Sequence, residues 1–380
     1  MSKIVNLKEL SLLFLRLGAT SFGGPVAHIA VMEKEVVHKK QWMTREHFLD
    51  LIGMTNLIPG PNSTEMAMHC GYNRSGALGL WVAGFCFIFP SFIITGIFAW
   101  FYKHYGALPG IAPFFYGVKP AVIAIILDAV FKFGKKAWKN WKVGFVGIAM
   151  LFAIPAAIVF NIPNIVFILI AGFFGMLVLS VLSNLKGSIK SIAPFTLLQV
   201  GNALPSYSTA KLFFVFLKIG CVLFGSGYVL FAYLDVDLVQ HLGWLTRKQL
   251  MDAIAVGQFT PGPVLSSATF IGYQISGIGG ALVSTIGIFL PSFIFVWILT
   301  PFIPKIRKSP LASAFLDSVN IASIALMLAV CVQMGTTTLI DWKTWAIGLA
   351  GLACLLLFKK LNAFWIVAGG AVIGFVMQGI

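Results

Sequence analysis

The chain has 380 residues, of which 59% are hydrophobic and only 10% are charged, and its formal net charge is +15. A soluble domain carries about 25% charged residues, so this composition excludes an ordinary soluble protein and predicts an all-α polytopic membrane protein. The positive-inside rule explains the net positive charge by lysines in cytoplasmic loops. Nucleic-acid binding is not expected, because no segment is long enough to form a soluble domain that could carry it.

Apolar stretches long enough to cross a bilayer recur along the whole chain. A membrane-spanning helix needs about 20 apolar residues. The first half contains five such stretches, near 10–31, 75–102, 111–131, 143–160 and 164–183. The second half also contains five, near 211–233, 277–300, 311–334, 344–358 and 362–379. We expect no cleavable signal peptide, because the first stretch contains Arg16 and continues through Gly-Gly-Pro without a small-residue cleavage site.

Each half also holds a shorter, interrupted apolar segment, 48–72 and 250–274, with Pro-Gly-Pro near its middle. Pro ends or kinks a helix, and Gly permits a tight turn. The simplest prediction is a re-entrant hairpin that enters the membrane, turns at Pro-Gly-Pro and returns. Such backbone is tolerated at membrane depth only inside the protein or along a wet cavity.

The two halves repeat the same motifs in the same order. Phe22-Gly23-Gly24-Pro25 returns 202 residues later as Phe224-Gly225-Ser226-Gly227, and Pro59-Gly60-Pro61 returns at the same distance as Pro261-Gly262-Pro263. Pro90-Ser91-Phe92 returns 201 residues later as Pro291-Ser292-Phe293. We therefore predict a first repeat over 1–183, a linker over 184–210 and a second repeat over 211–380, as in many secondary transporters.

Five spans and one hairpin in each half require the second repeat to be inverted, and the loop charges agree. The loop after the third apolar segment carries only Lys103 in the first half, whereas its counterpart carries Lys305, Arg307 and Lys308. The next loop reverses the bias, with only Lys343 in the second half. Its first-half counterpart carries Lys132, Lys135, Lys136, Lys139 and Lys142. Matching loops with opposite bias are what the positive-inside rule requires of inverted repeats.

The helix breaks of each half form the predicted binding site. Asn62 and Ser63 follow Pro61 and favour a helix N-terminus, so a helix is expected to begin there. A helix that begins in mid-membrane directs free N–H groups and its positive dipole end at the cavity, which suits an anion. Alternatively, these Gly and Pro residues only let helices pack or kink. The residues of the breaks that we predict to bind the anion are Gly23, Gly24, Pro25, Pro59, Gly60, Pro61, Asn62, Ser63, Gly225, Ser226, Gly227, Pro261, Gly262, Pro263 and Ser266.

Side chains near the breaks complete the predicted site. Arg16 and its repeat mate Lys218 precede the first break, where a charge costs about 2.5–3.5 kcal/mol, so each is expected to face the substrate or to snorkel to the interface. Asn56 and its mate Gln258 either donate amide hydrogens to an oxyanion or close the hairpin. Glu65 either carries a proton for coupled transport or complements the helix dipole.

Other polar residues are predicted to be structural or solvated. Asp128 and Lys132 have the i,i+4 spacing of a local ion pair, and the role of Lys119 stays open. His28 and His69 are expected to be core residues. The acids expected to be solvated are Glu33, Glu35, Asp235 and Asp237. The sequence contains no metal-ligand cluster and no C-x-x-C pair, so we expect no metal and no cofactor.

Taken together, these motifs resemble the chromate ion transporter family in its long, two-domain form. The first-half pattern is Phe22-Gly23-Gly24-Pro25 with His28, then Trp42, Pro59-Gly60-Pro61, Gly71-Tyr72 and Pro90-Ser91-Phe92. The second-half pattern is Phe224-Gly225-Ser226-Gly227-Tyr228, then Gln258 with Pro261-Gly262-Pro263, and Pro291-Ser292-Phe293. The chain departs from the family pattern at Asn56, Ser226 and Asn62. The resemblance implies transport of chromate, a tetrahedral dianion, across the cytoplasmic membrane, usually outward and giving chromate resistance.

Alternatives remain at the level of the substrate and of the function class. Sulfate is the structural analogue of chromate, so a carrier of sulfate or another oxyanion is the second hypothesis. An intramembrane enzyme or lipid-phosphate handler is a distant third, because the sequence offers no nucleophile–base pair and no metal motif. No Walker A motif is present, so this chain is not expected to use ATP. The expected partners are the oxyanion and the lipid bilayer, and a homodimer is one alternative for the oligomeric state.

Overall fold

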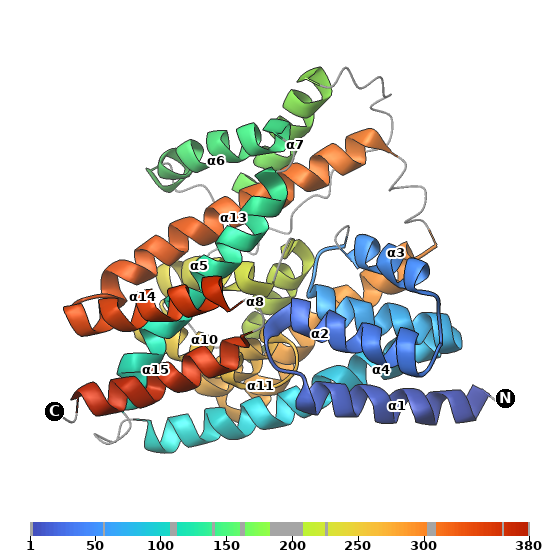
Figure 1. Cartoon of the computed structure of the whole chain (residues 1–380), viewed down its shortest axis with the longest axis horizontal. Helices are drawn as coiled ribbons and strands as arrows, with labels where there is room; N and C mark the ends of the chain where they lie inside the picture. Colours follow the sequence, from blue (N-terminus) through green and yellow to red (C-terminus); the bar gives the residue numbers. More distant parts are fainter. Residues whose placement is uncertain are drawn as a thin grey trace.

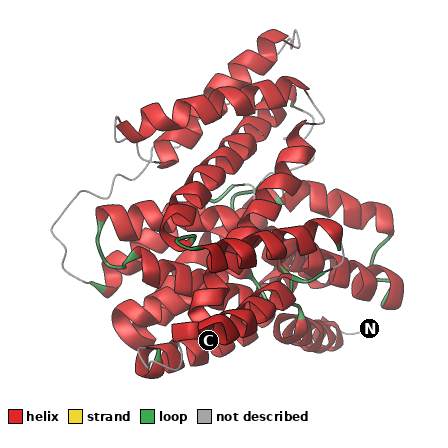
Figure 2. Ribbon diagram, turned by 60° about the vertical axis from the view of Figure 1, so that its left-hand side comes forward, coloured by secondary structure: helices red, strands yellow, loops and turns green. Residues whose placement is uncertain are grey.

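The structure is a computed structural model that describes residues 3–55, 58–106, 112–138, 141–159, 164–182, 208–224, 227–301, 309–358 and 361–378. Over these residues every regular element is a helix, as Figures 1 and 2 show. Four helical stretches are long and apolar enough to cross a membrane: Asn62–Tyr105, Pro113–Lys135, Val264–Leu299 and Pro310–Thr338. The predicted all-α polytopic fold is therefore confirmed.

One bundle consists of the helices that carry the repeated motifs (Figure 1). The first repeat supplies α1 (Lys3–Thr20), α2 (Gly24–Glu33), the π-helix η1 (Lys34–Lys39), α3 (Arg45–Thr55) and α4 (Asn62–Tyr105). The second repeat supplies α8 (Thr209–Val222), the 3-10 helix η2 (Gly227–Val229), α9 (Leu230–Leu234), the π-helix η3 (Asp235–His241), α10 (Arg247–Phe259), the 3-10 helix η4 (Val264–Ser266) and α11 (Ser267–Leu299). Because α1 packs on α4, α8 packs on α11, and α4 packs on α11, the two repeats share one bundle.

The remaining helices form a second bundle beside the first. They are α5 (Ala112–Trp138), α6 (Trp141–Val159), α7 (Asn164–Leu182), α13 (Pro310–Thr338), α14 (Trp342–Leu357) and α15 (Ala363–Gln378). Helix α13 packs against α5, α6 and α7, and α5 also packs against α14 and α15. The second bundle meets the first through α10, which packs on α5 and α15.

Helices α4 and α11 each reverse direction near their beginning. Ser284 Oγ donates to the carbonyl of Ala268 at 2.7 Å, although 16 residues of straight helix would separate them by about 24 Å. The reversal occurs at Ser276-Gly277, where Gly277 has φ 62°. Ser75-Gly76 adopts nearly the same angles in α4. Each Pro-Gly-Pro segment lies between the helix that ends before it, α3 or α10, and the short first segment of α4 or α11, which is the order of elements that the predicted re-entrant hairpin requires.

The first repeated break, Gly23-Gly24-Pro25, also folds the chain back on itself. Arg16 on α1 contacts Glu35 on η1 at 2.5 Å, and Lys40 contacts Glu9 near the start of α1 at 2.5 Å. These two contacts are possible only if α1 and α2–η1 run antiparallel. The structure thus divides the predicted span 10–31 into the two arms of a hairpin, because Gly23 and Gly24 adopt φ 102° and 78°.

The long arms of α4 and α11 run antiparallel to each other. Trp81 near the start of the α4 arm stacks on Phe293 far along α11. At the other end of α4, the Ala99 carbonyl accepts a hydrogen bond from Gln274, just before the reversal of α11. Repeat-mated helices that run in opposite directions are the geometry of an inverted repeat.

Several sequence predictions fall on residues outside the described part of the chain. The predicted linker 184–210 is described only over 208–210, and α8 already begins at Thr209. Of the charges that predict orientation, those outside the described residues are Lys139, Lys186, Lys190, Lys305, Arg307, Lys308, Lys359 and Lys360.

Two ion pairs occur twice, once in each repeat. Arg16 with Glu35 returns as Lys218 with Asp237 at 2.9 Å. Lys39 also binds Glu35, and the Lys39 and Arg16 side chains hold the pKa of the Glu35 carboxyl below its usual range. The second pair, Arg45 with Glu33 at 3.0 Å, returns as Arg247 with Asp235 at 3.0 Å. The prediction that these four acids are solvated is wrong for Glu35 and Asp235, which are buried, because each pairs with a cation of another helix, Arg16 on α1 for Glu35 and Arg247 on α10 for Asp235.

The repeat supplies a matched test of these pairs. Asp235 is fully buried and accepts from Arg247 and Gln240, whereas its mate Glu33 is about a quarter exposed. We expect Asp235→Asn to lower the free energy of unfolding by about 2 kcal/mol, and Glu33→Gln by less than about 1 kcal/mol. Denaturant titration of both variants in the same detergent measures the difference. Equal losses would contradict a buried structural role for Asp235.

Candidate functional site

The Pro-Gly-Pro tips of the hairpins lie inside the first bundle, and each tip is bonded to the opposite repeat. The Gly60 N–H donates to the Leu223 carbonyl at 2.7 Å, and the Gly262 N–H donates to the Ser21 carbonyl at 2.8 Å. Both Pro-Gly-Pro turns are buried, whereas Gly76 and Ser276 at the reversals are exposed. The turns therefore lie deep in the bundle and the reversals lie at its surface.

The two central glycines lie against the repeated Pro-Ser-Phe motif of the opposite repeat. A Cβ on Gly60, which has φ 145°, would overlap Ser292 Oγ and Glu65 Oε1. A Cβ on Gly262, which has φ 87°, would lie 2.8 Å from Ser91 Cβ and 3.0 Å from the Gly18 carbonyl. The close approach that glycine permits here is between the two repeats.

The first repeated break joins the same centre. A Cβ on Gly24 would lie 2.8 Å from the Tyr228 hydroxyl, so the break of one repeat lies beside that of the other. A Cβ on Gly23 would lie 2.9 Å from Asn362 Oδ1, just before α15. Phe22, from the same break, packs on Phe364 with ring centroids 5.2 Å apart. The tip of α1–α2 therefore also contacts the second bundle.

Buried polar groups without protein partners gather around the two Pro-Gly-Pro turns. Such atoms occur elsewhere in the described part of the chain too, for example on His28, His69 and Ser323, but six residues that carry them belong to the turns or to the segments next to them: Thr64, Glu65, Ser91, Gln258, Ser266 and Ser292. All six residues are buried. Most buried polar atoms in proteins are hydrogen-bonded, and the exceptions often hold water or an ion. The centre of the bundle is therefore suited to a small polar ligand.

Helix N-termini adjoin this polar centre, as the sequence predicts. Helix α2 begins at Gly24 after the break, and α4 begins at Asn62 after Pro61. The expected capping is wrong in one detail. Pro61 occupies the N-cap position of α4 with no side-chain cap, and Asn62 is the first helical residue. After Pro263 the chain forms the short 3-10 helix η4 before α11 begins at Ser267.

The two cations predicted to bind the substrate, Arg16 and Lys218, each form an ion pair within the protein. Arg16 and Lys218 are held by Glu35 and Asp237, and the Arg16 side chain is 55% exposed. The structure therefore makes both cations part of the hairpin packing. Three predicted site residues, Asn56, Gly225 and Ser226, lie outside the described residues.

Sequence reasoning missed the two serines that face the central glycines and the tyrosine beside Gly24. Ser91 and Ser292 belong to the repeated Pro-Ser-Phe motif, so their repetition was the available signal. Tyr228 follows the second-repeat break directly, but its first-repeat mate is Val26, and no repeated pattern distinguishes it.

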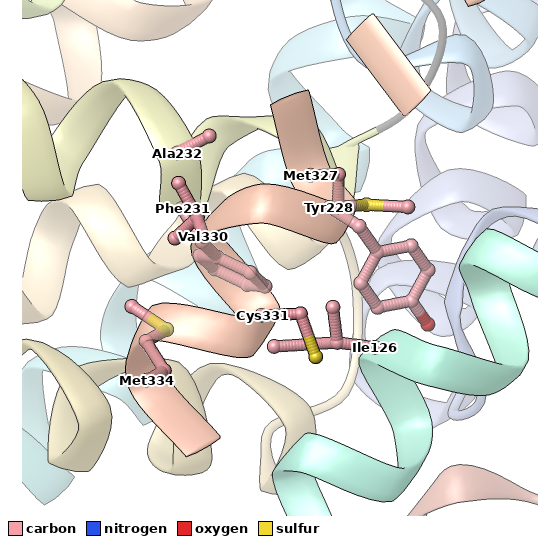
Figure 3. A pocket seen from close by; sticks show the side chains of 8 residues that line it. All are labelled: Ile126, Tyr228, Phe231, Ala232, Met327, Val330, Cys331 and Met334. Carbon is pink, nitrogen blue, oxygen red and sulfur yellow. The ribbon is translucent and has the colours of Figure 1, made fainter. Parts of the chain in front are cut away.

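Two cavities lie between the bundles, and they differ in character. One is a narrow apolar crevice with no room for a water molecule, which Figure 3 shows between α5, α9 and α13. Its walls are Ile126, Tyr228, Phe231, Ala232, Met327, Val330, Cys331 and Met334. The other has a volume of about 740 Å³ and is lined by polar side chains, among them Lys103, Lys119, Lys248 and Asp252. Its size and polarity suit a hydrated ion, whereas the apolar crevice suits none.

Comparison with known proteins identifies the relatives of this chain. The sequence profile of a family described as chromate transporter matches residues 8–176 and again 210–375. A chromate transport protein of Cupriavidus metallidurans is 33% identical, with 98% of this chain and 93% of that protein aligned. A probable chromate transport protein of Synechococcus elongatus is 31% identical, with 97% and 95% aligned. A chromate transport protein of Pseudomonas aeruginosa is 29% identical, with 96% and 91% aligned. No solved structure matches the chain.

Proposed function

The chain belongs to the chromate transporter family, a family of membrane transporters rather than enzymes, and from this premise we propose that it carries chromate out of the cell as a secondary transporter. The observation that carries the proposal is the polar centre, the set of buried polar groups without protein partners around the two Pro-Gly-Pro turns, each of which is bonded to the opposite repeat. These groups are suited to bind a tetrahedral dianion because both repeats contribute hydrogen-bond donors to them.

The proposed site binds the oxyanion with neutral donors and helix ends. Ser91, Ser292 and Ser266 supply hydroxyl groups, Gln258 supplies an amide, and the first turn of α4 supplies N–H groups and the positive end of its dipole. Backbone and hydroxyl donors bind a dianion without the rigid ion pair that would slow its release. Arg16 and Lys218 then support the site by holding the hairpin arms in place.

Alternating access would follow from movement of the two repeats around this centre. Each Pro-Gly-Pro turn is bonded to the opposite repeat, so displacement of one hairpin changes the contacts of the other. Glu65 lies against Gly60 in the first turn of α4, where a protonated carboxyl could donate to the oxyanion. We therefore assign proton coupling to Glu65.

The test is flux of radiolabelled chromate in liposomes that contain the purified protein, with a pH gradient imposed or collapsed. We expect saturable flux that sulfate inhibits and that the gradient alters, and we expect Glu65→Gln to remove the effect of the gradient. Protein-free liposomes are the control. Flux of sulfate without flux of chromate would keep the architecture and contradict the proposed substrate.

A further inference from the structure

The polar cavity between the bundles contains an ion pair that the internal repeat does not duplicate. Lys119 Nζ on α5 lies 3.3 Å from Asp252 Oδ1 on α10, and the side chains are 17% and 2% exposed. The repeat mates of these residues are Asn320 and Asp50, which do not form an ion pair because asparagine carries no charge. The two ion pairs described above occur in both repeats, whereas the pair of Lys119 with Asp252 has no counterpart at the mated positions.

The loop after Lys103 is the lysine-poor member of its pair, so the positive-inside rule predicts that it lies outside. Lys103 and Gly106 line the cavity, and the cavity is therefore predicted to lie at the outer end of the molecule. Its walls include Gly106 at the end of α4, Thr246 before α10, Thr338 at the end of α13 and Gln378 near the chain end. Lys103 and Lys248 also line it, so the described lining residues comprise three lysines and one carboxylate and carry a net positive charge. A positively charged recess concentrates anions by electrostatic attraction.

Asp252 retains a partner if Lys119 turns away from it. Tyr102 donates its hydroxyl to Asp252 Oδ2 at 2.7 Å, from α4. Exchange of Asp252 for another anion at Lys119 therefore leaves the carboxylate hydrogen-bonded. Asp252 lies seven residues before Phe259, where α10 ends, and this is about 10 Å along the helix. The same helix therefore connects the cavity with the Pro-Gly-Pro turn that follows it.

We propose that Lys119 is a second oxyanion-binding residue of this transporter, at its outer end, and that Asp252 occupies Lys119 until the oxyanion replaces it. This inference rests on the proposed function, because it assumes that an oxyanion passes between the bundles. The class of ligand is a small tetrahedral dianion, which accepts from an ammonium group as a carboxylate does.

The test is equilibrium binding of radiolabelled chromate to the purified protein in detergent, with the variants Lys119→Gln, Asp252→Asn and the double variant. Loss of a charge-assisted hydrogen bond predicts at least about tenfold weaker binding for Lys119→Gln. Removal of the competing carboxylate predicts at least about threefold tighter binding for Asp252→Asn. The double variant is expected to bind as weakly as Lys119→Gln. Lys132→Gln is the control, because Lys132 pairs with Asp128 on its own helix and does not line the cavity. This variant is expected to bind chromate as the wild type does.

A purely structural ion pair predicts a different pattern. In that case both single variants weaken binding or fail to fold, and the double variant, which leaves no unpaired charge, binds as the wild type does. Either that pattern or an unchanged Lys119→Gln would overturn the proposal, and the double variant decides even if the single variants fail to fold. If the wild type binds sulfate but not chromate, the proposed substrate fails, and the same comparison with sulfate tests Lys119 independently.

Discussion

Replacement of Gly280 with valine is expected to abolish accumulation of folded protein in the membrane. A Cβ at this position would overlap the Gly272 carbonyl oxygen and lie 2.8 Å from Ser276 Cβ. The two segments of α11 on either side of the reversal at Ser276-Gly277 approach each other backbone to backbone here. Neither segment can move away without opening that reversal. Overpacking of a well-packed site costs about 1–3 kcal/mol, and a clash with backbone exceeds that because no side chain can rotate away.

The neighbouring glycine provides the control for this experiment. A Cβ on Gly279 would have no atom within 4 Å, although Gly279 lies in the same helix. Gly279→Val is therefore expected to accumulate as the wild type does. Membrane levels and size-exclusion profiles of the two variants measure the difference. A folded Gly280→Val protein would show that the two arms of α11 are not closely packed.

Replacement of Gly262 with valine is expected to abolish transport of the oxyanion. Gly262 adopts φ 87°, a conformation that costs other residues about 1–2 kcal/mol, and its Cβ would press on Ser91 and on the Gly18 carbonyl. The valine would also strain the hydrogen bond from the Gly262 N–H to Ser21. Because the turn, the break of α1 and Ser91 all border the polar centre, a small displacement there removes several donors at once.

A valine at Gly243 is the control that separates backbone strain from the clash with neighbouring groups at the turn. It adopts φ 60°, but a Cβ there would have no atom within 4 Å. Gly243→Val is expected to keep most of the transport rate, whereas Gly262→Val and its mate Gly60→Val lose it. Initial rates in liposomes, corrected for the amount of folded protein, measure this. Normal rates for both turn variants would remove the Pro-Gly-Pro turns from the mechanism.

The helices could be predicted from the sequence because their signals are local. The predicted span 311–334 and α13 over Pro310–Thr338 agree closely, as do the predicted hairpins with α3–α4 and α10–α11. The prediction for 10–31 differs because an apolar run of 22 residues has the same composition whether it crosses the membrane or folds back at Gly23-Gly24. The contacts of Arg16 with Glu35 and of Lys40 with Glu9 distinguish the two arrangements.

The ion pairs show why the candidate site could be predicted only in part. Opposite charges 19 residues apart recur in both repeats, at Arg16 with Glu35 and at Lys218 with Asp237, so a signal for these pairs existed. Their meaning depended on the fold-back of α1 on α2, which the span prediction excluded. Lys119 offered no such signal, since its partner Asp252 lies in the other repeat.

The sequence by itself determined the membrane class, the internal repeat, the positions of the helix breaks and the family, because composition, period and motif are properties of the chain in order. The tertiary structure alone decided which breaks meet and which charges pair. It bonded each Pro-Gly-Pro turn to the opposite repeat, paired Arg16 with Glu35 and Lys218 with Asp237, and left Lys119 with Asp252 in a polar cavity. The physical reason is that these contacts join residues that are distant in sequence. Their strength also depends on burial, and the residues become buried only when the helices pack together.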